Sequence, residues 1–151
     1  MPQSLSNVIL HIVFSTKDRY PFLDGEIRER MHGYLATLCR DLNCTCYKVG
    51  GVADHVHVVT TLPRTLTQSA LLEAIKKKSS KWIKEIDRAK YGKFAWQRGY
   101  GAFSVSFSNL DGVVDYAANQ DEHHRKQTFQ AEFRKLLAKH NMDYDEKYVW
   151  D

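Results

Sequence analysis

Two histidines separated by one residue, His55 and His57, lie in a stretch rich in β-branched residues and could hold one metal ion. Successive side chains of a strand point to opposite faces, so both histidines project from the same face of a sheet. Their ring nitrogens could then reach a single cation. Histidines on a half-buried strand are more often hydrogen-bonded or solvated than metal-bound, so the pair by itself leaves both interpretations open.

Tyr116 and Gln120 form a second candidate group, on a helix that we expect to begin near Leu110. Residues four apart are neighbours on a helix, so a hydroxyl nucleophile and an amide ligand could act together there. The same spacing also fits a packing tyrosine and a solvated glutamine. The polar run that follows contains His123 and His124, which point in different directions on a helix and are therefore poor joint ligands for one metal.

Two stretches have a composition that suits a nucleic-acid partner, one through positive charge and the other through positive charge combined with aromatic rings. A basic stripe runs along the helix expected over residues 67–87, and residues 93–100 interleave aromatic residues, basic residues and glycine. Lysine and arginine could contact phosphates while the rings stack on bases, although a solvated face and core packing would explain the same residues. The candidate DNA-contacting residues are Lys77, Lys81, Lys84, Trp96, Arg98 and Tyr100.

The apolar patterns predict the order strand, helix, strand, strand, helix, strand. Strands are expected over residues 7–15, 44–49, 54–62 and 102–108, and helices over 25–42 and 67–87, with Asp24 as the N-cap of the first helix. Gly50 and Gly51 indicate the turn of a hairpin between the second and third strands. This order is the split βαβ, ferredoxin-like arrangement, an α+β fold with a four-stranded antiparallel sheet and two helices on one face.

The opposite face of that sheet must also be covered. Either the C-terminal helices, one carrying Tyr116 and the last capped by Thr128, or a second subunit could cover it. His11 lies inside the apolar first strand, where we expect a hydrogen-bonded core histidine rather than a ligand. The free edge of the strand over residues 102–108 would expose unpaired backbone groups that can pair with other chains. We therefore expect this edge to be paired in a homodimer.

A length of 151 residues and a mass of 17.5 kDa predict a single domain over residues 1–151. The net charge of +4 permits a nucleic-acid partner without requiring one. There is no apolar run long enough to cross a bilayer and no secretion signal at the N-terminus, so we expect a cytoplasmic protein without a membrane partner. Cys39, Cys44 and Cys46 suit neither a disulfide framework nor a structural zinc site, and we expect reduced thiols.

Three motifs in this order resemble those of the small single-tyrosine HUH transposases of the insertion-sequence 200/605 group. The first is His55-Val56-His57 after the glycine pair, and the second is the stretch over residues 94–104. The third is Tyr116-Ala117-Ala118-Asn119-Gln120, followed by an acidic residue and two histidines. The resemblance covers essentially the whole chain, and the combination of motifs is far more specific than the histidine pair alone.

The resemblance implies a site and a reaction. His55 and His57 would hold a divalent metal, Mg²⁺ or Mn²⁺, with Gln120 as a further ligand and Tyr116 as the nucleophile. The substrate would be single-stranded DNA with hairpins near the element ends, cleaved and rejoined through a 5′-phosphotyrosine. The resemblance also implies a homodimer with active sites shared between subunits, Tyr116 of one subunit serving the histidines of the other.

Two alternatives remain at this point. The same chemistry could belong to a domesticated nickase that acts on genomic palindromic repeats, although the lack of a long C-terminal extension favours the insertion-sequence type. A binding module with the same sheet, whose histidines are structural and whose basic stretch simply holds nucleic acid, would bind DNA without forming a covalent adduct.

Overall fold

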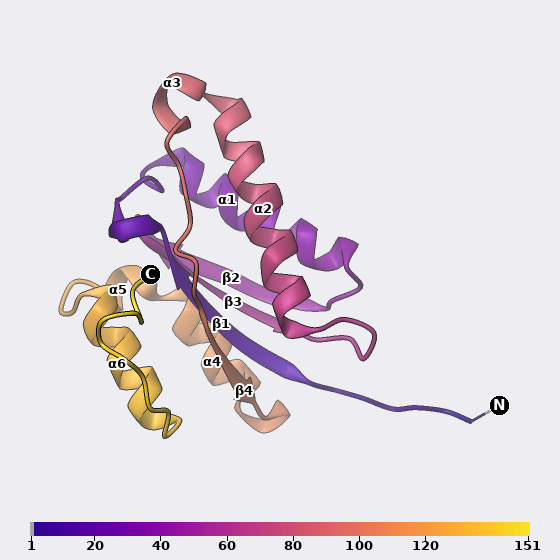
Figure 1. Ribbon diagram of the computed structural model, residues 1–151. Coiled ribbons are helices and arrows are strands. Elements are labelled where there is room, and N and C mark those ends of the chain that lie inside the picture. The colour runs from indigo at the N-terminus through magenta and orange to yellow at the C-terminus, as the bar shows by residue number, and fades with distance from the viewer. Residues whose placement is uncertain (1) are drawn as a thin grey trace.

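The computed structural model describes residues 2–151 and shows an antiparallel sheet between two layers of helices (Figure 1). The sheet has four strands in the order β2-β3-β1-β4, and each neighbouring pair is antiparallel. The strands are β1 (Ile9–Ser15), β2 (Cys46–Val52), β3 (His55–Thr61) and β4 (Gly101–Val105). This topology confirms the predicted split βαβ fold.

One face of the sheet is covered by α1 (Glu26–Asp41) and α2 (Gln68–Ile86), and α2 is followed by the short helix α3 (Arg88–Tyr91). Thr67 caps α2, because its hydroxyl accepts a hydrogen bond of 3.1 Å from the backbone N–H of Ala70. The main hydrophobic core lies between these helices and the strands. The two helices predicted for this face are therefore confirmed, to within two residues at each end.

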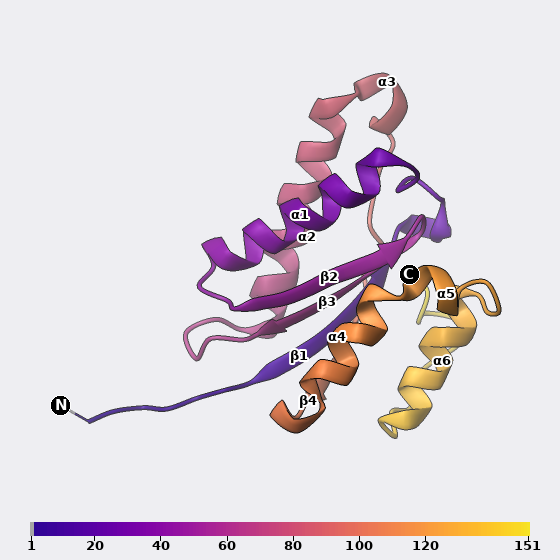
Figure 2. The same ribbon diagram turned by 180° about the vertical axis from the view of Figure 1, so that it is seen from behind.

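The opposite face is covered by α4 (Leu110–Ala118), α5 (Gln120–His123) and α6 (Phe129–Lys139), as Figure 2 shows from behind. Thr128 caps α6 as predicted, because its hydroxyl accepts a hydrogen bond of 3.1 Å from the backbone N–H of Ala131. Phe129, Phe133 and Leu137 are the buried face of α6 and pack against Val13 and Phe103 of the sheet. Of the two alternatives for this face, the C-terminal helices cover it here.

Two predictions about local structure were wrong. Gly25, not Asp24, occupies the N-cap position of α1, with a φ of 73° that glycine adopts without strain. Gly50 and Gly51 do not form the hairpin turn but lie inside β2, opposite His57 and Val56 of β3. The turn falls at residues 53–54. A Cβ at Gly50 would lie 1.9 Å from the carbonyl oxygen of Ala117, so the glycine lets α4 approach the sheet.

The last strand is also shorter than predicted. β4 ends at Val105, which pairs with Ile9, the first residue of β1. Beyond that point β1 offers no ladder partner, and residues Phe107–Asn109 form a 3₁₀ turn that leads into α4. Phe107, expected on the same face as Phe103, is 72% exposed. Among the helices of residues 2–151, none is both long and apolar enough to span a membrane.

Candidate metal centre and nucleophile

Strand β3 places His55 and His57 on the face of the sheet that α4 and α6 cover, and both side chains are fully buried. The Nδ1 atom of His55 lies 2.7 Å from a carboxylate oxygen of Asp54, and Nδ1 of His57 lies 2.7 Å from Nε2 of His11. These contacts orient each ring, so both Nε2 atoms are directed at the same point. His11 is 5% exposed and hydrogen-bonded, which confirms it as a core histidine.

Glu132 of α6 closes the site from the side opposite the strand. Its carboxylate is 1% exposed, and Oε1 lies 3.0 Å from Nε2 of His57, 3.5 Å from Nε2 of His55 and 3.1 Å from Nε2 of His124. One ligand atom each from His55, His57 and Glu132 lies within 4.8 Å of the others. Two imidazole nitrogens and a carboxylate at this spacing could hold a divalent metal ion.

The side chain of Gln120 also lies at this centre. Its Oε1 lies 3.1 Å from Nε2 of His55, and the residue is 1% exposed. The helix predicted to carry both Tyr116 and Gln120 is interrupted at Asn119, between α4 and α5. The pair stays together nonetheless, because Nε2 of Gln120 donates a hydrogen bond of 3.0 Å to the backbone carbonyl of Tyr116.

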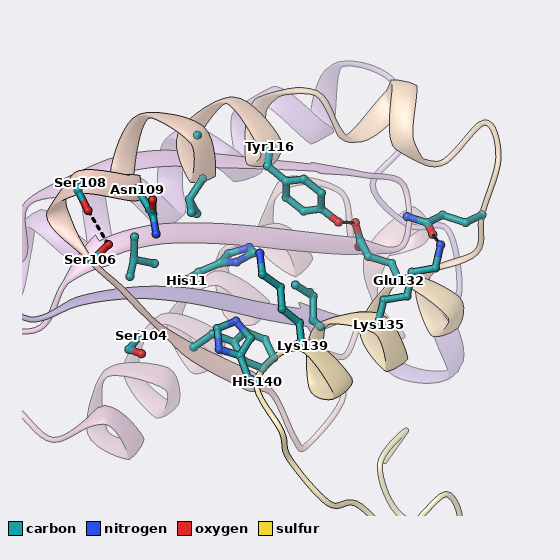
Figure 3. A pocket seen from close by; sticks show the side chains of 16 residues that line it. His11, Ser104, Ser106, Ser108, Asn109, Tyr116, Glu132, Lys135, Lys139 and His140 are labelled. Atoms are coloured by element: carbon teal, nitrogen blue, oxygen red, sulfur yellow. Dashed lines mark hydrogen bonds between the residues drawn. The ribbon is translucent and has the colours of Figure 1, made fainter.

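Tyr116 projects from α4 toward this centre, and its hydroxyl donates a hydrogen bond to Oε2 of Glu132 (Figure 3). Its ring centroid lies 5.7 Å from that of His57, and its other side is stacked on His123 at 4.4 Å. The histidine strand β3, the candidate nucleophile Tyr116 and the carboxylate of Glu132 therefore lie together within one chain. His123 and His124 do point to different partners, as expected.

Burial and hydrogen bonding set the protonation states of the cluster. Burial opposes protonation of His55, but hydrogen bonds to Asp54 and Glu132 outweigh it and raise its pKa to about 9. Burial lowers the pKa of His57 to about 4. Burial disfavours the charged carboxylate of Glu132, yet hydrogen bonds from the surrounding histidines hold its pKa far below the usual value. Burial and the hydrogen bond to Glu132 raise the pKa of Tyr116, which is therefore a neutral phenol.

The sequence patterns did not indicate Glu132 as a site residue, nor the contact that His124 makes with it. A signal was present, because Glu132 lies at helical spacing within the apolar run of Phe129, Phe133 and Leu136. A carboxylate on the core face of a helix must find partners in the interior. Nothing local, however, indicates that those partners are the histidines of β3.

The candidate DNA-contacting residues lie on the other side of the sheet, along α2 and the segment before β4. Lys77, Lys84, Arg98 and Tyr100 line a groove of about 440 Å³, and Lys77, Lys81 and Lys84 line a second of about 430 Å³ beside it. Trp96 also lines the first groove, but it is 8% exposed and belongs to the core, so little of its ring is open to a base.

Lys76, next to this basic face, has a structural contact instead. Its ammonium donates to the carbonyl oxygens of Gln97, Arg98 and Gly99 at 2.9, 3.2 and 2.7 Å. Burial lowers its pKa to about 8. Lys76 therefore links the segment before β4 to α2 by hydrogen bonds. These bonds also help to position Arg98 and Tyr100, which belong to or follow that segment.

The fold and the site define an α+β protein with a buried histidine and carboxylate centre beside a tyrosine. The family model "Transposase IS200 like" matches residues 4–120. The transposases for insertion sequence element IS200 of Salmonella typhimurium and Salmonella typhi are each 31% identical over 120 residues, which cover 77% of this chain and 78% of each relative. The chain therefore belongs to the IS200-like transposase family.

Solved structures of transposases share the fold. A transposase from Deinococcus radiodurans aligns with a TM-score of 0.64 at 17% identity, covering 80% of this chain and 95% of that one. A REP-associated tyrosine transposase bound to a REP hairpin aligns with a TM-score of 0.55 at 16% identity, covering 78% of this chain and 68% of that one. At these identities the likeness concerns the fold.

Proposed function

We propose that this transposase cleaves and rejoins single-stranded DNA by metal-assisted transesterification, with Tyr116 as the nucleophile. The observation that carries the proposal is the hydrogen bond from the Tyr116 hydroxyl to Glu132, the same carboxylate that contacts His57. A tyrosine that only packed in the core would not need its hydroxyl at the centre formed by His55, His57 and Glu132, which could hold a metal.

The ligands of the metal would be His55, His57 and Glu132, with Gln120 beside them. This set of nitrogen and oxygen donors fits Mg²⁺ or Mn²⁺, and imidazole favours Mn²⁺. When bound, the ion supplies positive charge to the phosphate oxygens of the substrate. Asp54 and His11 hold the two rings in the orientation that a ligand needs.

In the proposed step the phenolic oxygen of Tyr116 attacks phosphorus in line with the leaving oxygen. The bond to the 3′ oxygen breaks, so the products are a 5′-phosphotyrosine and a free 3′-hydroxyl. The phenol gives up its proton as its oxygen attacks, and the leaving 3′ oxygen takes up a proton, so the step balances. Glu132 accepts the hydrogen bond of the phenol and holds its oxygen at the metal centre. The phosphotyrosine keeps the energy of the broken bond for the joining step, which hydrolysis would lose.

The proposed partner is single-stranded DNA with hairpins. The REP-associated relative has been solved with a REP hairpin, and the exposed residues Lys77, Lys81 and Arg98 lie on one face of this chain. Basic side chains gathered on one face can contact successive phosphates. Tyr100, half-buried beside them, is the candidate for stacking on a base.

We also propose a homodimer, because the outer edge of β4 has no partner strand among the described residues. In this structure Tyr116 meets the histidines of its own chain. A site shared between subunits would require Tyr116 to leave Glu132 and reach the partner. The shared site stays a prediction.

A domesticated nickase is the second candidate, favoured by the likeness to the REP-associated transposase. It would use the same residues and the same covalent step. The two differ in their DNA, because an element transposase acts at ends that flank its own gene and a nickase acts on scattered palindromes.

The test is a covalent adduct. The protein is incubated with Mn²⁺ and labelled single-stranded DNA from the flanks of its gene, then denatured. We expect a labelled protein band for the wild type and none for Tyr116→Phe, which loses only the attacking oxygen. Tyr100→Phe is the matched control and should keep the adduct. An adduct that survives Tyr116→Phe would assign the nucleophile elsewhere, and no adduct from the wild type would favour a binding module.

A further inference from the structure

A groove of about 780 Å³ leads away from Tyr116 between α4 and α6, on the face of the sheet that carries the metal centre (Figure 3). Tyr116 and Glu132 line one part, and Ser106, Ser108 and Asn109 line another. In Figure 3 these two groups lie on opposite sides of His11 and Lys139. The volume lies in the range of ligand pockets, roughly 300–1,000 Å³, and suits a few nucleotides rather than a folded hairpin.

The α6 wall of this groove is basic. Glu132, Lys135 and Lys139 follow one another at helical spacing and all line the groove, whereas Phe133 and Leu137 are buried against the sheet. Lys135 and Lys139 are exposed, and the Lys135 ammonium donates a hydrogen bond of 3.0 Å to the side-chain oxygen of Gln127. Among the lining residues, Glu132 is the acidic one, and its carboxylate oxygens already have hydrogen-bond partners in His57, His124 and the Tyr116 hydroxyl.

The groove also offers a ring and hydroxyl groups. His140 is half-buried and stacked on Phe103, with ring centroids 4.6 Å apart. Histidine rings are among the side chains on which unpaired bases stack. The hydroxyl groups of Ser104 and Ser106 add exposed donors and acceptors on the β4 side.

We propose that this groove binds the single-stranded DNA next to the phosphate that Tyr116 attacks, with Lys135 and Lys139 contacting its phosphates. The assignment rests on the proposed function and extends it to the path of the substrate. The basic surface on α2 lies across the sheet and cannot guide a strand to Tyr116 directly, whereas this groove ends at the tyrosine.

The test measures binding of a 12-nucleotide single strand of mixed sequence by fluorescence anisotropy at several salt concentrations, in EDTA so that nothing is cleaved. Each phosphate contact contributes about 0.7 to the salt slope of single-strand binding. We expect Lys135→Ala with Lys139→Ala to weaken binding several-fold and to lower the slope by about twice that value. Lys126→Ala with Lys147→Ala, two exposed lysines outside the groove, is the matched control and should bind as the wild type does.

A second pair of variants locates the strand. Ser106→Glu should weaken binding more than Ser106→Gln does, because the two side chains are similar in size and only glutamate places a negative charge in the groove. An unchanged salt slope in the Lys135/Lys139 variant, or equal effects of Glu and Gln at Ser106, would overturn the groove assignment. These measurements need no cleavage, so they are independent of the adduct experiment that tests the proposed function. The same titration of Lys77→Ala with Lys81→Ala reports contacts on the other face.

Discussion

Glu132 is the residue on which the site converges. Its two carboxylate oxygens serve different groups: Oε1 contacts His57 and His124, and Oε2 accepts from Tyr116. A buried carboxylate is costly unless it is paired, and here the cost is offset by these hydrogen bonds. The residue therefore links the candidate metal ligands to the candidate nucleophile.

Loss of a metal ligand should affect metal binding and cleavage together. We expect His57→Ala to weaken Mn²⁺ binding at least tenfold and to abolish adduct formation, because the Nε2 atom of His57 belongs to the three-residue cluster. Glu132→Gln, which keeps the size and removes the charge, should also weaken Mn²⁺ binding.

His124→Ala is the comparison for this experiment, because His124 contacts Glu132 but lies outside that cluster. It should keep either most of the Mn²⁺ affinity or most of the cleavage. Calorimetric titration and the adduct assay measure the two properties, and equal losses in His57→Ala and His124→Ala would count against the strand-pair site.

The position of α4 depends on a close contact with β2. A Cβ at Gly50 would lie 1.9 Å from the carbonyl oxygen and 2.7 Å from the carbonyl carbon of Ala117, and backbone atoms cannot move aside as a side-chain end can. Gly50→Ala should therefore push α4 away, destabilise the protein by about 1–3 kcal/mol and slow adduct formation by displacing Tyr116.

Gly33→Ala is the matched control for Gly50→Ala. Gly33 lies inside α1, and a Cβ there would meet nothing within 4 Å. Alanine in a helix interior stabilises by up to about 1 kcal/mol relative to glycine. Urea unfolding gives both free energies, and similar values for the two variants would argue that α4 does not depend on Gly50.

Helix α1 contributes to the acid sensitivity of the fold through His32. Burial, with Arg28 and Lys48 nearby, lowers its pKa to about 4, and its Nε2 has no hydrogen-bond partner among the described atoms. Asp121 and His55 also act on it, in opposite directions. The folded-state pKa lies below the unfolded value of about 6.5, so the unfolded chain binds more protons between those values.

The free energy of unfolding should therefore fall as the pH falls from about 6.5 toward 4. For a half-buried ring we expect a loss on the order of 1 kcal/mol from this group between pH 7.5 and 5. His32→Gln should reduce the difference between urea unfolding curves at those two pH values. A variant with the full wild-type pH dependence would exclude His32 as a contributor.

At the scale of the whole molecule, the open question is whether one chain completes its own site. Tyr116→Phe and His57→Ala should each be inactive. If sites are shared across a two-fold interface, mixing the two and allowing exchange leaves one intact site in each heterodimer, so about a quarter of all sites should recover. If each site is built within one chain, as the contact between Tyr116 and His57 allows, every site keeps a lesion.

Adduct yield after exchange measures that recovery, with sedimentation to establish the dimer. A well-exchanged dimer that shows no recovered activity would exclude the shared site without contradicting the dimer itself. A quarter of the wild-type yield would show that Tyr116 leaves its own Glu132 to reach the partner subunit.

The order of strands and helices, the faces of β3 and the pairing of Tyr116 with Gln120 follow from the sequence by itself. Each depends on a local rule: period two places His55 and His57 on one face, and spacing by four keeps Tyr116 and Gln120 adjacent even across the break at Asn119. The resemblance of the motifs to a transposase family was confirmed by the family match.

Only the tertiary structure decided which residues complete the centre. Glu132 lies 75 positions after His57, and its contact with that histidine depends on how α6 packs across the sheet. The same kind of long-range packing made Gly50 a strand residue beneath α4 and placed Trp96 in the core. Short-range patterns report the neighbours along a strand or helix, whereas these contacts join elements whose docking depends on the shape of the whole sheet.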